Sequence, residues 1–475
     1  MSPDKVMEYL LYLEAKHEVG TWRCQGLDVW PIIRQSLYNQ LIKKKVTSKK
    51  KSVHQQSVRS LYTAYQAAKK RLRQVKNIDV LFLANQTHRA RLHGQVWNRF
   101  CDPLMDELAL LGKSSFLIEE SKTDVFSEKN HQENRLFNIE PLLNWQRFSR
   151  QVEKRLRLVR PLNLEFRKNL ESIVDELQSK SGSVISINKI IREIESVILS
   201  LKLAGRVLDA LAPKKIHTVC YYGAWNMAVL FEARKRGIIT SDIQHGVIND
   251  LHPMYCNWSN MPTSGFNTLP QVFFTWSATE LNFIMEWATK TNFHRSATLG
   301  NPWLSLFREK KVSTQEIKID KPLILYTLAN RDDIFFNSLV EFVNKYHHKF
   351  EIWFRMHPRQ IPFADEVEAE LKDKMILDKI NLKQASELPL PFILSKTSAH
   401  ITLLSSVVLE AMEFNVPSLV LGDLGYNYFK QYENSQAVQF AKSEMLEPAL
   451  LNLMNKRIDI THEFLEISEM AKMVE

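Results

Sequence analysis

Short, continuously apolar segments alternate with longer amphipathic stretches along most of the chain. The first series begins at Ile78 with "IDVLFLA" and continues with "SSFLIEE", "HTVCYYG", "SDIQHG", "QVFFTWS" and "SATLGNP". Residues 130–210 have helical spacing instead, most clearly in "INKIIREIESVILSLKLAGRVLDAL". Apolar strands that alternate with helices predict βαβ units and a parallel sheet covered on both faces.

A second series follows the charged connector "REKKVSTQEIKIDK" and contains "PLILYTLA", "FEIWFRMHP", "MILDKI", "HITLLSS" and "PSLVLGD". The pattern predicts an α/β protein with two doubly wound, Rossmann-like domains facing a cleft, where such folds bind ligands at the carboxyl ends of strands. We expect a helical extension with a basic arm at 1–76, a first domain with a helical insertion at 77–305, a second domain at 306–440, and C-terminal helices at 441–475.

The composition supports this organisation. A chain of 475 residues, 45% hydrophobic and 24% charged, suits two globular domains. The N-terminus lacks the pattern of a signal peptide, and no apolar run reaches the 18 residues that a membrane-spanning helix needs. The four cysteines are isolated and form no CxxC pair, which favours reduced thiols in the cytoplasm.

The net charge of +10 is concentrated in one segment. Residues 43–76 contain twelve Lys and Arg and no acidic residue, which leaves −2 for the rest of the chain. The second half of this segment has Leu61, Tyr62, Tyr65, Ala68 and Leu72 at helical spacing. It predicts either a peripheral contact with an anionic inner-membrane surface or a solvated linker helix. Nucleic acid is a poorer candidate, because no nucleic-acid-binding motif accompanies the charge.

Several common site motifs are absent from the sequence. There is no GxGxxG after a strand, no HExxH and no GxSxG, and only 13 glycines occur in all. A dinucleotide site, a zinc protease site and a serine-hydrolase elbow are therefore not expected. We expect no metal and no cofactor, and electrostatics that come from side chains and helix ends.

Polar side chains follow two apolar strands of the second predicted domain. Arg355 and His357 end the strand "FEIWFRMHP", where guanidinium and imidazole can bind phosphate oxygens. Ser405 and Ser406 end the strand "HITLLSS" and open a predicted helix, so that hydroxyls and backbone N–H groups can face an anion. Glu410, one turn later, could accept a hydrogen bond from a ribose hydroxyl.

A third polar group follows a strand of the first domain, in "SDIQHGVINDLHPMY". His245 ends the strand, Gly246 permits a sharp turn, and Asp250 and His252 follow on the loop. Each of the three patterns also has a structural explanation, because such residues often cap carbonyls, helices or turns. Their occurrence together favours a functional site.

The pairing of "HP" (His357-Pro358) with "SS" (Ser405-Ser406) resembles the signature motifs of bacterial GT-B glycosyltransferases that use CMP-activated acidic sugars, such as sialyltransferases, polysialyltransferases and capsule Kdo transferases. The loop at 241–255 and the tryptophan-rich N-terminus are similar to capsule and O-antigen biosynthesis proteins. The resemblance implies that His357, Ser405 and Ser406 contact the donor phosphate. It also implies a metal-independent site between two domains, with the chain after about 440 packing back on the first.

The resemblance implies transfer of a sugar, of Kdo or sialic acid type, from a nucleotide donor to a cell-surface polysaccharide or lipid-linked acceptor. A pyrimidine nucleotide is favoured. The Asp/Glu-Gly motif that carries the base in sialyltransferases is missing, since His93-Gly94 occupies the comparable place. Asp102, His245 and Asp250 are the candidate bases, and inversion and retention both stay open. The alternatives are a CDP-glycerol phosphotransferase, a nucleotide-sugar epimerase and a non-catalytic nucleotide- or glycan-binding protein.

Overall fold

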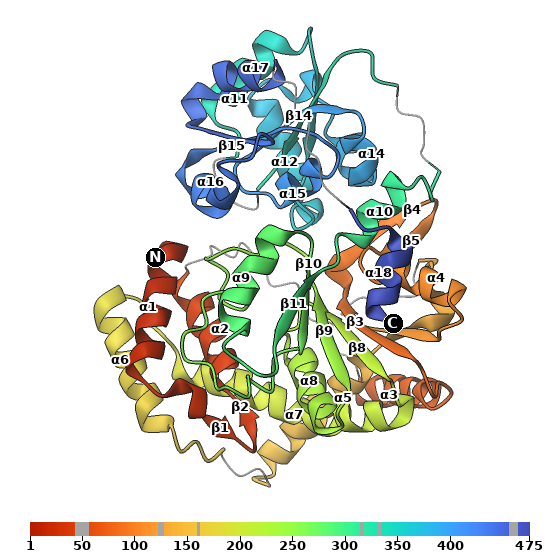
Figure 1. Cartoon of the computed structure of the whole chain (residues 1–475), viewed down its shortest axis with the longest axis vertical. Coiled ribbons are helices and arrows are strands. Elements are labelled where there is room, and N and C mark those ends of the chain that lie inside the picture. The colour runs from red at the N-terminus through yellow and green to blue at the C-terminus, as the bar shows by residue number, and fades with distance from the viewer. Residues whose placement is uncertain (43–56, 122–127, 159–161, 314–317, 330–333, 456–463) are drawn as a thin grey trace. The chain divides into compact units, whose positions relative to one another are not determined.

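The computed structural model describes the chain except for residues 43–56, 122–127, 159–161, 314–317, 330–333 and 456–463 (Figure 1). It contains two compact units. Unit 1 comprises residues 1–89, 96–301 and 467–475, and unit 2 comprises residues 90–95 and 302–466. The helical N-terminus thus belongs to the first unit. Of the predicted C-terminal helices, only the last belongs there.

Unit 1 is built on a seven-stranded parallel sheet. Its order is β11-β10-β9-β8-β3-β6-β7. From β3, the strands β6 and β7 are added toward one edge of the sheet. The next strand, β8, pairs with the other side of β3, and β9, β10 and β11 are added toward the opposite edge. The strands are β3 (Val80–Asn85), β6 (Ser115–Glu120), β7 (Leu136–Asn138), β8 (Lys215–Val219), β9 (Ile239–Ile243), β10 (Val272–Thr275) and β11 (Arg295–Thr298). This order places a topological switch point between β3 and β8, where open α/β sheets bind ligands at the carboxyl ends of strands.

Helices surround this sheet and share one hydrophobic core with it. Helix α7 packs on α8, α18 packs on α4, and α1 packs on α2. The serine side chain of Ser186 caps α7 by accepting from the N–H of Lys189, while Ser277 and Glu280 form a capping box at α9. These helices are α1 (Pro3–Lys16), α2 (Trp30–Leu41), α4 (Asp102–Leu110), α5 (Glu140–Arg155), α6 (Arg167–Ser181), α7 (Ile187–Leu211), α8 (Ala224–Lys235), α9 (Ala278–Ala288) and α18 (Ile467–Val474).

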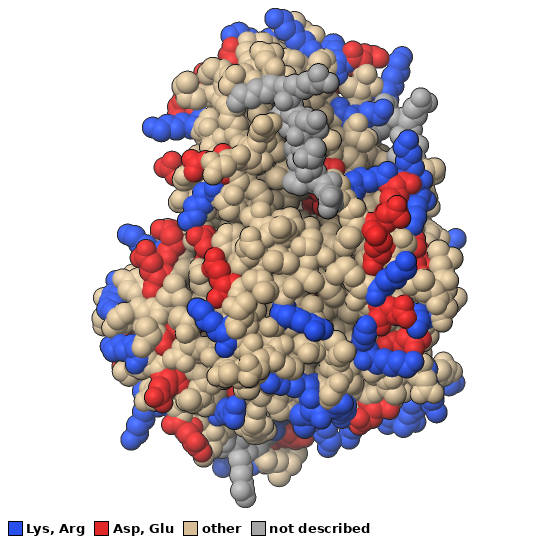
Figure 2. Space-filling view, viewed as in Figure 1, with Lys and Arg blue, Asp and Glu red and all other residues tan. Residues whose placement is uncertain are grey.

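The second half of the basic segment forms helix α3 (Val58–Leu72), which packs on α5. The rings of Tyr62 and Tyr65 lie 5.2 and 5.4 Å from the ring of Trp145, centroid to centroid. Part of the apolar face that we predicted to meet a membrane is therefore occupied by α5. Lys and Arg side chains gather over these two helices at the lower right of Figure 2. The first part of the arm, 43–56, lies outside the described residues, and membrane contact stays a prediction.

Unit 2 contains a five-stranded parallel sheet of order β13-β12-β14-β15-β16. Its strands are β12 (Leu323–Thr327), β13 (Glu351–Arg355), β14 (Thr397–Thr402), β15 (Ser418–Leu421) and β16 (Val438–Ala441). The switch point lies between β12 and β14. The helices are α10 (Pro302–Arg308), α11 (Asn337–Tyr346), α12 (Ala364–Asp373), α13 (Lys383–Glu387), α14 (Leu390–Leu394), α15 (Val407–Met412), α16 (Gly422–Phe429) and α17 (Leu446–Met454).

The two parallel sheets confirm the predicted fold class, with some local differences. The segment "MILDKI" is not a strand, because Leu377–Lys379 forms a 3-10 helix and Ile376 is buried in the core. Strand β7, which lies in the segment predicted to be helical, was not predicted, and neither were strand β16 and the hairpin of β4 (Arg89–Leu92) and β5 (Gln95–Asn98). In the hairpin, polar residues interrupt the continuous apolar run by which the other strands were predicted. Among the described helices, none is long and apolar enough to cross a bilayer.

A fully buried histidine links three strands of unit 2. On β14, the Nε2 atom of His400 lies 2.8 Å from Thr327 Oγ1, and its Nδ1 atom lies 2.9 Å from Ser418 Oγ. Burial lowers the pKa of His400 to about 3, so the folded protein keeps this ring neutral.

This histidine makes the stability of unit 2 depend on pH. The unfolded chain binds a proton at His400 below pH ~6.5 and the folded chain does not, so stability falls as the pH falls from about 6.5. The contribution is about 1.4 kcal/mol per pH unit in that window. We expect His400→Asn to show a smaller loss in urea midpoint between pH 7 and pH 5 than the wild type. An unchanged pH dependence would contradict this origin.

Candidate functional site

The predicted phosphate-binding residues lie at one edge of the sheet of unit 2. His357 follows the carboxyl end of β13, while Ser405 and Ser406 follow the carboxyl end of β14. The strands are parallel, and β12 lies between them. Two strand spacings separate the two ends by roughly 10 Å. The topology thus brings both motifs to the switch point of this unit.

The imidazole of His357 is held in one tautomer by its own loop. Its Nδ1 atom accepts the backbone N–H of Arg359 at 3.1 Å, so the neutral ring carries its proton on Nε2. Its backbone N–H donates to Gln360 Oε1 at 2.9 Å, and the Gln360 amide donates to the carbonyl of Ala329 after β12. Burial, with a smaller effect of Arg359, lowers the pKa of His357 to about 4. At neutral pH this side chain is therefore an uncharged donor.

Arg355 contacts a neighbouring helix. Its Nη1 donates to the carbonyl of Leu388 at 2.8 Å and also to the carbonyl of Ala385, at the end of α13. The guanidinium therefore fastens α13 to the end of β13, which is the capping role that such residues often have. A contact between Arg355 and a ligand phosphate stays a prediction.

The two serines open helix α15. Ser405 Oγ accepts from the N–H of Val407 at 3.3 Å, and the carbonyl of Ser406 accepts from the N–H of Leu409 at 3.0 Å. Ser406 makes no side-chain capping bond. Glu410, on the same helix, is only 5% exposed. Burial to this degree limits its contact with a ribose, and that role too stays a prediction.

Helix α16 packs closely against the segment before these serines because one of its residues is a glycine. A Cβ added to Gly425 of α16 would lie 2.7 Å from the carbonyl oxygen of Leu403. Real Cβ atoms do not approach so closely, so the backbones can meet here only because the residue is glycine.

In unit 1, His245 follows β9 in a loop fixed by the preceding glutamine. The Gln244 amide donates to the carbonyl of Gly246 at 2.8 Å and accepts the N–H of Trp276 at 2.6 Å. The hydroxyl of Tyr222 lies 3.3 Å from His245 Nε2. Burial and the charge of Arg99 lower the pKa of His245 to about 4. A histidine with this pKa is a weak general base at neutral pH, which disfavours that predicted role.

Two residues beside His245 were missed by sequence reasoning. His88 follows β3, and its ring lies 5.4 Å from that of His245, centroid to centroid. The carbonyl of His88 accepts the N–H of Arg99 at 3.0 Å. The sequence did contain a signal for His88, since it lies in the polar loop directly after the first apolar strand of the series.

Asp102, our first candidate base, is the first residue of α4 and is 3% exposed. Its Oδ2 accepts the N–H of Asn98 at 2.9 Å, and its Oδ1 is buried without a hydrogen-bond partner among the described residues. Burial raises the pKa of Asp102 well above its ordinary value. A raised pKa suits proton transfer near neutral pH, but the deep burial leaves the catalytic role a prediction.

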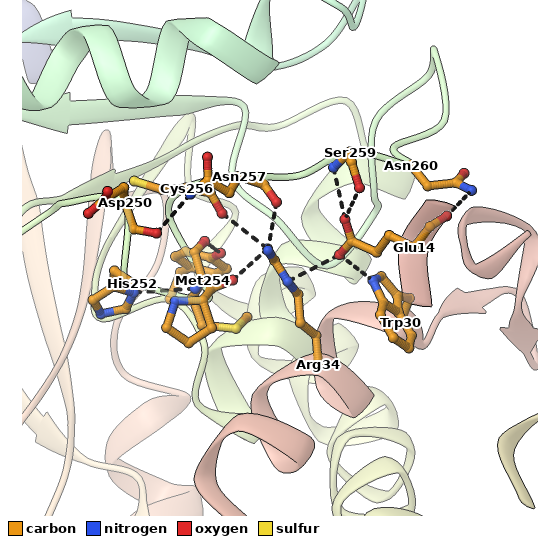
Figure 3. A network of polar contacts seen from close by, with 12 residues as sticks. Glu14, Trp30, Arg34, Asp250, His252, Met254, Cys256, Asn257, Ser259 and Asn260 are labelled. Atoms are coloured by element: carbon orange, nitrogen blue, oxygen red, sulfur yellow. Dashed lines mark hydrogen bonds and ion pairs between the residues drawn. The ribbon is translucent and has the colours of Figure 1, made fainter. Parts of the chain in front are cut away.

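The loop with Asp250 and His252 is tied down through its backbone. The carbonyl of Asp250 accepts from Asn257 Nδ2 at 2.7 Å, and His252 Nδ1 accepts the N–H of Met254 at 3.2 Å (Figure 3). The ring of His252 lies 4.7 Å from that of Tyr255. These contacts order the loop, and the predicted catalytic role of the Asp250 carboxylate stays a prediction.

A buried ion pair from the N-terminal helices holds the end of this loop (Figure 3). Arg34 and Glu14 are 0% and 1% exposed, with 3.1 Å between Arg34 Nε and Glu14 Oε1. Arg34 donates to the carbonyls of Pro253, Cys256 and Asn257. Glu14 accepts from the indole of Trp30 and from both the backbone and the hydroxyl of Ser259.

Comparison with known proteins identifies the fold. No protein-family model matches the chain, and no curated protein matches it in sequence. The UDP-GlcNAc 2-epimerase of Methanocaldococcus jannaschii has a similar structure, with a TM-score of 0.51 and 13% identity, over 84% of this chain and 98% of that chain. The UDP-GlcNAc 2-epimerase of Neisseria meningitidis has a TM-score of 0.49 at 15% identity, over 84% of this chain and 98% of that chain. The glycotransferase of kitacinnamycin has a TM-score of 0.46 at 9% identity, over 84% of this chain and 94% of that chain.

The likeness to the first of these structures, together with the two parallel sheets, shows a GT-B-like fold with two Rossmann-like domains. This is the fold class that the sequence predicted. The likeness shows the fold alone, and the resemblance to sialyltransferases and Kdo transferases stays a prediction.

The buried ion pair gives a testable prediction for unit 1. Glu14→Gln leaves the Arg34 guanidinium buried without its counter-charge, and we expect a loss of about 3–5 kcal/mol in the free energy of unfolding. The single variants Glu14→Leu and Arg34→Met are measured as well. The double variant Glu14→Leu/Arg34→Met should lose less free energy of unfolding than the sum of the losses in these two single variants. Denaturant unfolding followed by tryptophan fluorescence measures this.

Lys16→Met is the matched control, because the Lys16–Glu176 pair is exposed. Its loss in the free energy of unfolding should be small beside that of Glu14→Gln, because exposed ion pairs contribute little to stability. Equal losses from Glu14→Gln and Lys16→Met would show that the buried pair is not essential to unit 1.

Proposed function

We propose that the protein is an enzyme that acts on a nucleotide-activated sugar, and that the carboxyl edge of the sheet of unit 2 binds the diphosphate of this substrate. The observation that carries the proposal is the tautomer of His357. With Nδ1 occupied by the Arg359 N–H, the ring offers an Nε2–H donor beside the switch point. A neutral donor held in place before the substrate arrives costs little reorganisation when a phosphate oxygen approaches.

The second half of the proposed phosphate site is the pair Ser405 and Ser406. The two serines follow the strand on the other side of β12 from His357. The two strand ends are roughly 10 Å apart, a separation that an extended nucleoside diphosphate can bridge. Hydroxyl and imidazole donors stabilise negative charge that develops on a leaving phosphate when the bond to the sugar breaks. In this proposal the donors are side chains, without a metal ion, and a pyrimidine nucleotide is favoured.

The chemical outcome at the sugar has two candidates. Transfer to a polysaccharide or lipid-linked acceptor is supported by the resemblance of "HP" and "SS" to the motifs of sugar transferases that use CMP donors. Epimerisation of the nucleotide sugar is supported by the similar structure, at a TM-score of 0.51, of a UDP-GlcNAc 2-epimerase. Transfer requires an acceptor and a base, for which Asp102 and Asp250 are the better candidates, whereas epimerisation requires no acceptor.

Nucleotide binding tests the site directly. In a thermal-shift screen against CMP, CDP, UDP and GDP, we expect a pyrimidine nucleotide to stabilise the protein. His357→Ala should weaken that affinity by roughly 10- to 100-fold, because it removes a hydrogen bond to a charged group. His348→Ala, which changes an exposed histidine of the same unit, should bind as the wild type does. Equal affinity in both variants would exclude His357 from the site.

Product analysis separates the candidate reactions. The protein is incubated with UDP-GlcNAc, CMP-sialic acid, CMP-Kdo or CDP-glycerol, and the sugars are identified by chromatography and mass spectrometry. If the protein is an epimerase, we expect a nucleotide sugar that is inverted at one carbon, formed without an acceptor. If it is a sugar transferase, we expect free nucleotide to be released only when an acceptor is present. Transfer of glycerol phosphate would replace the sugar proposal, and binding without turnover would indicate a non-catalytic protein.

A further inference from the structure

Three polar atoms at the switch point of unit 1 are buried without hydrogen-bond partners among the described residues. They are the Nδ1 atom of His88, the Nδ1 atom of His245 and the Nε atom of Arg99. His88 as a whole is only 5% exposed. Buried polar atoms are almost always paired, so three unpaired atoms in neighbouring residues call for an explanation.

These three residues come together through the fold. His88 follows β3 and His245 follows β9, with β8 between those strands in the sheet. The two imidazole rings are 5.4 Å apart, and the N–H of Arg99 bonds to the carbonyl of His88. The guanidinium of Arg99 lies 5.3 Å from the ring of Phe100, which also contacts the ring of His88.

Two of the three unpaired atoms can act as hydrogen-bond donors. The Arg99 Nε–H can only donate. When the Tyr222 hydroxyl donates to His245 Nε2, the neutral His245 ring carries its proton on Nδ1, which is the unpaired atom. Burial is the main cause of the lowered pKa of both rings, and the positive charge of Arg99 lowers each pKa further. The same charge repels a bound cation. A metal ion is thereby disfavoured, and an oxygen with negative charge is favoured.

The geometry points to a binding site for an oxyanion, a carboxylate or a phosphate monoester, formed by Arg99, His88 and His245 at the switch point of unit 1. The anion accepts from the Arg99 Nε–H and from the two imidazoles. Arg99 supplies the charge, and the imidazoles supply direction. The site lies within unit 1 and does not depend on the proposed nucleotide site of unit 2.

The site is tested on the full-length protein labelled with ¹⁵N in the histidine rings. Sodium phosphate and sodium acetate are titrated separately at pH 7.0, with sodium chloride at matched ionic strength as reference. We expect the ring nitrogens of His88 and His245 to shift with one common saturation curve, while His400 in unit 2 stays unchanged. A response to phosphate alone assigns a phosphate monoester, and a response to acetate assigns a carboxylate.

Arg99→Gln should weaken the binding of the anion at least tenfold. Arg234→Gln is the matched control, because Arg234 also lies over a phenylalanine, Phe293, in unit 1, and its effect should stay below twofold. Retained signals of His217, which is buried on β8 in unit 1, and of His400 in unit 2 establish that each variant is folded. Should Arg99→Gln lose these signals, His88→Gln tests the same site, with the same expected loss.

The inference is overturned if neither anion shifts both rings, if chloride shifts them equally, or if the folded Arg99 and His88 variants bind as the wild type does. Binding of UDP is measured in the same samples and should be unchanged in Arg99→Gln. A protein that binds the anion but no nucleotide would overturn the proposed function and leave this site in place.

Discussion

The buried pair of Glu14 and Arg34 is the interaction on which the candidate site of unit 1 depends. Two charges in the interior carry a large desolvation cost, which is offset only when their remaining hydrogen-bonding atoms are used. Here, the guanidinium binds three carbonyls and stacks 4.0 Å from the ring of Trp258, while the carboxylate binds Trp30 and Ser259. The N-terminal helices therefore serve as a clamp on the segment at 253–260.

That clamp has consequences at the carboxyl ends of the strands. The clamped segment includes Tyr255, whose hydroxyl donates to the buried Asp242 on β9 at 2.6 Å. Asp242 also accepts from Thr218 on β8 at 2.7 Å, and burial raises the pKa of Asp242 to about 7. His245 lies three residues after Asp242 on the chain. The N-terminal extension is thus linked to the switch point through hydrogen bonds and short stretches of chain, and it is part of the unit.

The candidate sites were predicted from the sequence only in part. The positions of His357 and Ser405 could be predicted, because parallel strands end at one edge of a sheet and both residues follow apolar strands. The contacts of Arg355 could not be predicted, because its partners are carbonyls some thirty residues later in the chain, on and just after α13. His88 and Arg99 were missed because the hairpin of β4 and β5 separates them in the sequence and brings them together in space.

By itself, the sequence determined the alternation of apolar strands and amphipathic helices, and with it two parallel sheets, because local hydrophobic periodicity decides which elements form. It also determined which strands end in polar groups. Only the tertiary structure decided the order of strands, the switch points, the tautomer of His357 and the neutral state of the buried histidines. The order of strands, the switch points and the neutral buried histidines depend on neighbours distant in the chain and on exclusion of water. The tautomer of His357 depends on the conformation of its own loop, through the N–H of Arg359. A pattern of hydrophobic and polar positions contains none of these.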